Sequence, residues 1–419
     1  MTTVTHAETD ITLLAIPEAE GGSGLSRYRQ ALRTPGALPF AIPGVIGRLP
    51  MGMLSLAQVL VVVATTGRYG VAGGVSATGA LLYAVVTPRA GRLADRFGQA
   101  RVLRPLVVVF AVSTAAFAAC AIGRAPVWAL FLAGGLSRGT MPALGSMVRS
   151  RWSELLRGSA LLDAAFSLEG IADELIFITG PVLVVALATL VRPVAGVLVT
   201  AALSVAGVVG LTRQRRSEPA AAAGTHARGS ALRSPGLRVL VAMHAGLGAV
   251  FATVDLATID FAAEHGARPL AGALLGLYGL GSAVAGVWYG TRRWRSSQGS
   301  RLRVALAATV LGVVPLAFVT DVWEMAVAII VAGLGISATL ISSYSLAEAC
   351  VPAEHRTEGM SWLTTAASVG TALGAPVAGR LIDSHGASAG YVFAFAVGLA
   401  ALGIVAVGHR HLTFRAPGR

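Results

Sequence analysis

The sequence predicts an all-α membrane protein in which twelve transmembrane helices form two pseudo-symmetric bundles of six. Three observations indicate this fold class: an apolar composition, twelve apolar runs of spanning length, and a weak internal repeat that relates the two halves. Of the 419 residues, 55% are hydrophobic and 13% are charged, and the mean hydropathy is +0.71. This composition is typical of polytopic membrane proteins.

Twelve runs are long and apolar enough to cross the hydrocarbon core, which takes about 20 helical residues. They lie at 39–66, 70–90, 101–123, 126–148, 160–190, 193–212, 237–262, 270–290, 302–320, 323–349, 360–380 and 388–408. The first run departs most from a simple span because it contains Pro43, Arg48 and Pro50, and the fifth does so because it carries four acids.

Arginine placement predicts the orientation, since the sequence contains no lysine. With the N-terminus in the cytoplasm, 26 of the 33 arginines fall in the tails and even-numbered loops, 5 fall on the opposite side, and Arg48 and Arg138 remain inside the membrane. Both termini are therefore expected to be cytoplasmic. The net charge of +13 is spread over short loops, so no nucleic-acid partner is expected. We expect a bacterial, multi-pass protein of the plasma membrane, the bacterial inner membrane, that works as a monomer in the lipid bilayer.

The longest connection lies midway along the chain and separates six spans from six. The predicted organisation is a cytoplasmic tail at 1–37, a bundle at 38–212, a cytoplasmic linker at 213–236, a second bundle at 237–408 and a cytoplasmic tail at 409–419. The linker is rich in Arg, Ala, Ser and Gly, which suits two bundles that move relative to each other.

An internal repeat at an offset of about 195 residues supports two duplicated halves. Residues 79–82 recur at 272–275, and 178–182 resemble 373–377. The segment 90–96 aligns with 285–291, where the second copy has lost the aspartate of the first.

A charged segment, Ala90–Arg101, lies between the second and third runs and is predicted to be a short loop. Gly91 and Gly98 permit a tight turn, and the arginines suit a loop at an anionic cytoplasmic leaflet. Asp95 is a lone carboxylate that can pair with these arginines or cap a helix N-terminus, which makes it a candidate fixed point of one conformation.

This segment resembles the signature loop between the second and third transmembrane helices of the major facilitator superfamily. The positions that fit are Gly91, Asp95, Arg96, Gly98 and Arg101, whereas Gln99 and Ala100 stand where the family prefers basic residues. The resemblance implies the superfamily's two-bundle fold, a cytoplasmic position for the loop, and an aspartate that latches the two halves in one state.

Two arginines lie near the middles of predicted spans, where each charge costs about 2.5–3.5 kcal/mol on insertion scales. Arg48 is in the first span and Arg138 in the fourth. The surroundings of Arg138, Gly135–Thr140, resemble the superfamily's fourth-helix motif, which is associated with proton transfer. A structural counter-ion is the alternative for either residue.

The fifth span carries the other candidate transport residues. Glu169 and Asp173 are four apart and share a helix face, so we expect them to line a water-filled cavity, with Arg138 as their first partner. Glu174 is turned by about 100° and is expected to pair with an arginine of a neighbouring helix. Asp255 of the seventh span is expected near the mouth of the cavity. Such acids can load and release protons, or they can form static salt bridges.

Small residues and proline mark packing positions. Gly180–Pro181 in the fifth span resembles a truncated antiporter motif of the superfamily and predicts a helix kink. Glycine pairs at four-residue spacing, Gly272/Gly276, Gly286/Gly290 and Gly370/Gly374, are expected to allow close helix approach.

No sequence pattern indicates a phosphate-binding loop, a metal site, a cofactor or catalytic residues, so energy must come from a gradient or from the solute itself. These features favour a secondary active transporter that exports a small organic molecule, a drug or metabolite, in exchange for protons. An importer or uniporter of the same fold is the nearest alternative. A polytopic membrane enzyme or sensor is a further one.

Overall fold

The computed structural model describes residues 24–221, 229–292 and 294–412, and these residues contain helices and no strand. The first half contains α1 (Gly24–Arg33), α2 (Ala37–Thr66), α3 (Tyr69–Phe97), α4 (Gln99–Ile122), α5 (Val127–Gly139), α6 (Leu144–Leu155), α7 (Leu162–Leu190) and α8 (Pro193–Arg213). The second half contains α9 (Pro235–Glu264), α10 (Ala271–Thr291), α11 (Gln298–Val313), α12 (Val322–Gly333), α13 (Ile336–Cys350), α14 (Arg356–His385) and α15 (Ala387–Val407). Short 3-10 turns occupy 215–217, 231–233, 268–270, 314–317, 353–355 and 408–411.

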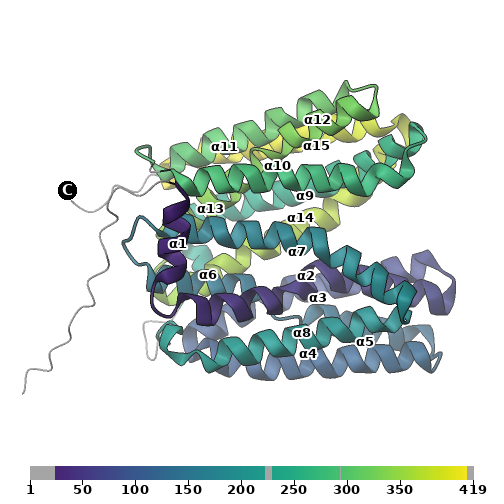
Figure 1. Cartoon of the computed structure of the whole chain (residues 1–419), viewed down its shortest axis with the longest axis horizontal. Coiled ribbons are helices and arrows are strands. Elements are labelled where there is room, and N and C mark those ends of the chain that lie inside the picture. The colour runs from purple at the N-terminus through teal and green to yellow at the C-terminus, as the bar shows by residue number, and fades with distance from the viewer. Residues whose placement is uncertain (1–23, 222–228, 293, 413–419) are drawn as a thin grey trace, which may run out of the picture.

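The helices form two bundles, α2–α8 and α9–α15, as the sequence predicts (Figure 1). Ten helical stretches among the described residues are long and apolar enough to cross a membrane. The fourth crossing is α5 followed by α6, each too short alone, and the eleventh is α14, which has 30 residues but a more polar sequence. The fold is therefore the predicted arrangement of twelve transmembrane helices.

Two segments differ from their prediction as loop or tail. Residues 24–33 of the predicted tail form α1, while 1–23 lie outside the described residues, as do 222–228 of the predicted linker and 413–419 of the second tail. The predicted loop 90–101 is mostly helix, because α3 continues to Phe97 and Gly98 alone separates it from α4. Gly98 has φ +93°, a conformation that favours glycine.

The two bundles meet at one end of the molecule. This closed end is the one that carries α1, the Gly98 turn and the connection between α8 and α9, and from it the bundles diverge toward the other end, the far end (Figure 1). The interface consists mainly of α3 against α14 and of α7 against α10. The helix α1 runs across the closed end, roughly perpendicular to the spans.

Glycine allows the closest helix crossings, but at only some of the expected positions. A Cβ on Gly370 of α14 would overlap the backbone oxygen of Ala245 in α9, and Gly374, Gly286 and Gly290 also lie against neighbouring segments. The prediction is wrong for Gly272 and Gly276, where a Cβ would meet nothing within 4 Å. Four-residue glycine spacing alone does not say which helix face is packed.

We expect Gly370→Ala to destabilise the second bundle by about 1–3 kcal/mol, because the added methyl group forces α14 away from the α9 backbone. Gly272→Ala is the matched control, and it is expected to leave stability unchanged or slightly raised. Thermal unfolding of both purified variants in detergent measures the difference. Equal melting temperatures would contradict the crossing.

Candidate functional site

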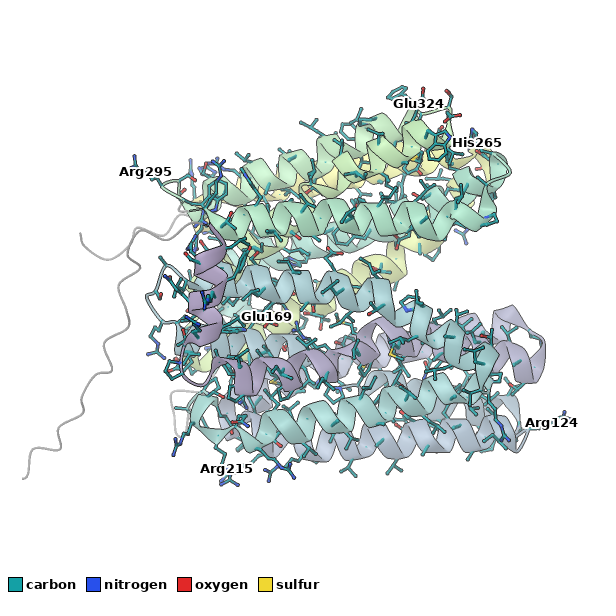
Figure 2. The ribbon with its side chains drawn as sticks, in the orientation of Figure 1. Arg124, Glu169, Arg215, His265, Arg295 and Glu324 are labelled. Atoms are coloured by element: carbon teal, nitrogen blue, oxygen red, sulfur yellow. The ribbon has the colours of Figure 1, made fainter. Side chains whose placement is uncertain are left out.

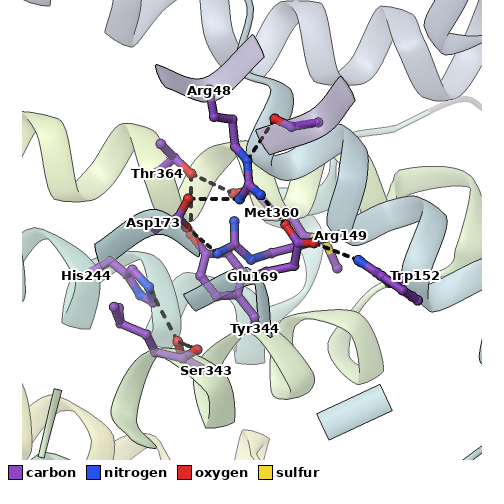
Figure 3. A network of polar contacts seen from close by, with 12 residues as sticks. Arg48, Arg149, Trp152, Glu169, Asp173, His244, Ser343, Tyr344, Met360 and Thr364 are labelled. Atoms are coloured by element: carbon purple, nitrogen blue, oxygen red, sulfur yellow. Dashed lines mark hydrogen bonds and ion pairs between the residues drawn. The ribbon is translucent and has the colours of Figure 1, made fainter. Parts of the chain in front are cut away.

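A buried cluster of two arginines and two acids is formed by helices of the first bundle (Figure 3), and Glu169, one of its acids, lies toward the closed end (Figure 2). Arg48 of α2 forms ion pairs with Glu169 at 2.6 Å and with Asp173 at 2.8 Å, both from α7. Arg149 of α6 reaches the other oxygen of Asp173 at 2.6 Å. Asp173 therefore bridges two arginines, and the four charges balance.

Neighbouring groups hold the cluster in this geometry. The Trp152 indole donates to Oε1 of Glu169 at 2.8 Å, and it packs edge-on against Phe40 with ring centroids 4.8 Å apart. The Arg48 Nε donates to the carbonyl oxygen of Gly44 at 3.1 Å. A buried ion pair offsets its desolvation cost only when such additional hydrogen bonds are present. The side chains of Arg48 and Glu169 are 2% and 3% exposed, whereas that of Asp173 is 20% exposed, so Asp173 is the member of this pairing that water reaches most.

The cluster also touches the second bundle. The guanidinium of Arg149 lies 4.2 Å from the ring centroid of Tyr344 in α13, a cation–π contact across the interface. Tyr344 in turn packs edge-on against His244 of α9, whose Nδ1 lies 3.0 Å from the carbonyl oxygen of Leu240. A change in the relative position of the bundles therefore acts directly on a residue that pairs with Asp173.

The predicted partner of these acids is wrong. Arg138 lies in the last turn of α5, on the other side of the break at 140–143, and its guanidinium lies 5.9 Å from the ring centroid of Tyr83. Arg149 takes the expected place, because the fourth span resumes as α6 and continues beyond the predicted boundary at residue 148. Sequence reasoning assigned Arg149 to a cytoplasmic loop. Pro142 was the sequence signal that this assignment overlooked, because the helix begins again shortly after it.

The remaining predicted acids have other environments. Glu169 is buried and does not line a water-filled space. Glu174 pairs with no arginine of the described residues: its carboxylate accepts a hydrogen bond from Ser282 of α10 at 2.6 Å, across the bundle interface. Asp255 is exposed in the middle of α9, and Tyr278 of α10 lies within electrostatic range of both Asp255 and Glu174.

Asp95 joins the bundles by capping a helix of the other half. Its two carboxylate oxygens accept hydrogen bonds from the backbone N–H groups of Thr357 at 3.1 Å and Glu358 at 2.8 Å, in the first turn of α14. Gly91 lies one turn earlier on the same face of α3, and a Cβ there would meet Ser361 Oγ at 2.6 Å. The small residue and the carboxylate together let α3 lie against the N-terminus of α14.

Further polar contacts surround this cap. Arg92, at a position that the superfamily pattern does not specify, forms a 2.7 Å ion pair with the fully buried Glu358. Hydroxyl pairs join α6 to α14, with Ser146 3.0 Å from Ser361 and Ser150 3.1 Å from Thr357. We call Asp95, Arg92 and these α6 and α14 partners the gate.

The other predicted motif residues lie outside the gate. Arg96 is exposed and its guanidinium lies 4.9 Å from the ring centroid of Phe97, and Arg101 is exposed on α4. Gly98 makes the turn described above. The helix α7 continues through Pro181, and Gly180 lies against the backbone of Gly52 in α2, so this position provides close helix approach. The predicted kink stays a prediction.

Three solved structures with a similar fold are of transporters or transporter homologues. A bacterial homologue of the iron transporter ferroportin in the outward-facing state has a TM-score of 0.73 at 14% identity, over 90% of this chain and 99% of that one. A structure of such a homologue with soaked iron has a TM-score of 0.67 at 14% identity, over 89% and 99%. The human organic anion transporter MFSD10 (TETRAN) has a TM-score of 0.63 at 17% identity, over 91% and 98%. No curated protein sequence matches the chain significantly.

These likenesses show that the chain has the two-bundle fold of these transporters. The sequence profile of the Major Facilitator Superfamily matches residues 240–413, in the second bundle. The chain is therefore similar to the Major Facilitator Superfamily over its second bundle.

We expect Arg48→Met to destabilise the protein by about 3–5 kcal/mol, because Glu169 would be left buried without its cation. The double variant Arg48→Met with Glu169→Gln is expected to recover part of this loss, since it removes both charges. Arg89→Met, at an exposed arginine of α3, is the control. Melting temperatures in detergent check the series, and a double variant no more stable than the single one would contradict the pairing.

Proposed function

We propose that the protein is a proton-coupled exporter of a small organic molecule that works by alternating access between the two bundles. The observation that carries this proposal is Asp173, a partly exposed acid that bridges Arg48 and Arg149, one of which rests on the second bundle. When the bundles part at the closed end, Arg149 loses its contact with Tyr344. A carboxylate whose cationic neighbour moves away binds a proton more readily. Bundle motion and proton binding are thereby linked.

The proposed orientation places the closed end in the cytoplasm of a plasma membrane, with both termini on that side. The arginine distribution supports it, because the arginines concentrate at the loops of this end. In this orientation the structure corresponds to an outward-facing state. The likeness to an outward-facing ferroportin homologue is consistent with that assignment. We propose that the protein works as a monomer.

The charges favour a cationic or neutral amphipathic solute. Glu169 and Asp173 neutralise Arg48 and Arg149, so this cluster offers an anion no surplus positive charge. Glu174 is held by a hydroxyl group, and Asp255 is exposed. Export is preferred over import because of the resemblance of 180–181 to an antiporter motif. Deletion of the gene raises cellular accumulation of the solute if the protein exports it and lowers accumulation if it imports it.

We expect uptake of a fluorescent lipophilic cation into everted membrane vesicles to fall when an electroneutral ionophore collapses the pH gradient, because the gradient supplies the energy. A growth-inhibition panel with and without overexpression selects the cation. Asp173→Asn is expected to abolish the response to the gradient, whereas Asp383→Asn, at an exposed acid near the C-terminal end of α14, retains it. Transport that is insensitive to collapse of the gradient in the wild type would exclude proton antiport.

We expect Asp95→Asn to leave expression intact and to depress transport several-fold. The amide keeps one acceptor for α14 but loses the charge and presents an N–H group to the N–H of Thr357 or Glu358. Initial rates in the same vesicles, normalised to protein amount, check this expectation. Normal transport by Asp95→Asn would remove Asp95 from the transport cycle, and Arg96→Gln, at an exposed neighbour, serves as the control.

A further inference from the structure

The two halves are not latched in the same way. The internal repeat places Gly290 of α10 at the position of Asp95 in α3, so the second half has no carboxylate with which α10 could cap α7. The corresponding pair of helices is nevertheless closed: Ser167 Oγ of α7 donates to the carbonyl oxygen of Gly286 at 2.6 Å. Asp163 of α7 pairs with Arg301 of α11 on this side at 2.7 Å, and another group joins α7 to α10.

That group is α1. The Tyr28 hydroxyl lies 2.9 Å from Ser167 Oγ in α7 and 2.8 Å from the carbonyl oxygen of Val287 in α10. It lies so close to Gly290 that a Cβ there would overlap it. Tyr28 is 7% exposed. A side chain from α1 therefore occupies the space that a side chain at position 290 would need.

Arg27 makes a second bridge beside Tyr28. Its guanidinium donates to the carbonyl oxygen of Gly290 at 3.2 Å and to that of Arg292, at the C-terminus of α10. It also donates to the carbonyl oxygen of Ala160, which precedes α7 in the first bundle. The last carbonyls of a helix have no partner within the helix, and a cation there is favourable. Arg27 thus caps α10 and ties it to the first bundle.

The sequence of α1 suits this position. Arg27, Tyr28 and Ala31 are buried on its inner face, while Leu25 and Arg29 are exposed on its outer face. Gly36, with φ +93°, turns the chain from α1 into α2, so α1 is attached to the first bundle at its C-terminal end. An inward-facing state must separate α7 from α10 at the closed end, and it cannot do so while Arg27 and Tyr28 hold both.

We propose that Arg27 and Tyr28 are positioning residues of the transport cycle, and that α1 is a strap that holds α7 against α10 and takes the place of the aspartate absent from the second repeat. The strap stabilises the outward-facing state and is released from α10 when the closed end opens. This inference rests on the proposed alternating-access function but on neither proton coupling nor the identity of the solute.

Distances between spin labels test the strap in the full-length protein, in detergent and without substrate or gradient. Both native cysteines, Cys120 and Cys350, are replaced by serine, and labels are attached at position 104 of α4 and position 303 of α11, which are exposed near the closed end. A second pair at positions 128 and 324, exposed near the far end, reports the opposite opening. Double electron–electron resonance then gives the population of each state.

Tyr28→Phe removes the hydroxyl and keeps the ring, and we expect it to raise the ratio of inward- to outward-facing molecules about five-fold, the effect of one net hydrogen bond. Arg27→Gln with Tyr28→Phe is expected to raise it further. Arg29→Ala, at the exposed neighbour on the outer face, is expected to leave both distributions unchanged.

Melting temperatures, measured beside the distances, distinguish an effect of α1 on the conformational equilibrium from an effect on stability alone. Lower stability of the Tyr28 and Arg27 variants with unchanged distance distributions would overturn the proposal, as would an equal shift in Arg29→Ala. The vesicle assay tests proton coupling independently of the strap. A negative result in that assay does not contradict the role of α1, and unchanged distances in the Tyr28 and Arg27 variants do not contradict proton coupling. A distance distribution that never shows a second state in any variant would argue against alternating access itself.

Discussion

Two backbone N–H groups at the start of α14 lie buried at the bundle interface, and the Asp95 carboxylate of the opposite bundle accepts from both. A buried N–H group without an acceptor is costly, and the helix dipole adds to the attraction for a negative charge. The closed arrangement of α3 and α14 depends on this contact. Its acceptor comes from the other bundle, so separation of the bundles must replace it with water. The gate is therefore stable while water is excluded from the interface, and it can open reversibly when water replaces the Asp95 carboxylate as the acceptor.

The duplicated halves solve the same problem with different chemistry. In α3 a side chain of the repeat itself, Asp95, supplies the capping group. In α10 the equivalent position is Gly290, and capping comes from Arg27 of α1, which acts on the C-terminus of α10 and not on the N-terminus of α7. One latch is thus part of a span, while the other is a separate helix joined by a short connection at Gly36. Because of this asymmetry, the contacts of α1 contribute to the equilibrium between the outward- and inward-facing states.

Periodicity and composition predict the spans and their division well, because a bilayer imposes helix length and apolar character on each crossing. They predict poorly which side chains contact one another. The expectation that Arg138 faces the acids of α7 assumed an unbroken fourth span, and the break at 140–143 puts Arg149 there instead. The partner of Glu174 is a serine, which no charge pattern reveals. The packing of α1 was equally invisible, since ten residues with three arginines resemble any basic tail.

The strengths of the contacts explain how rigid bundles can still move. The fully buried ion pair Arg48–Glu169 lies within the first bundle, and breaking such a pair costs about 3–5 kcal/mol. Contacts between bundles include hydroxyl hydrogen bonds such as Ser146–Ser361, each worth about 0.5–1.5 kcal/mol net, and ion pairs more exposed than Arg48–Glu169, such as Arg92–Glu358 and Arg301–Asp163. One charge moved through 100 mV supplies about 2.3 kcal/mol. A gradient can therefore bias an equilibrium that opens several interface contacts, but it leaves the internal pairing intact. Asp173 takes part in both kinds of contact. It pairs with Arg48 inside the first bundle and with Arg149, which packs against Tyr344 of the second bundle.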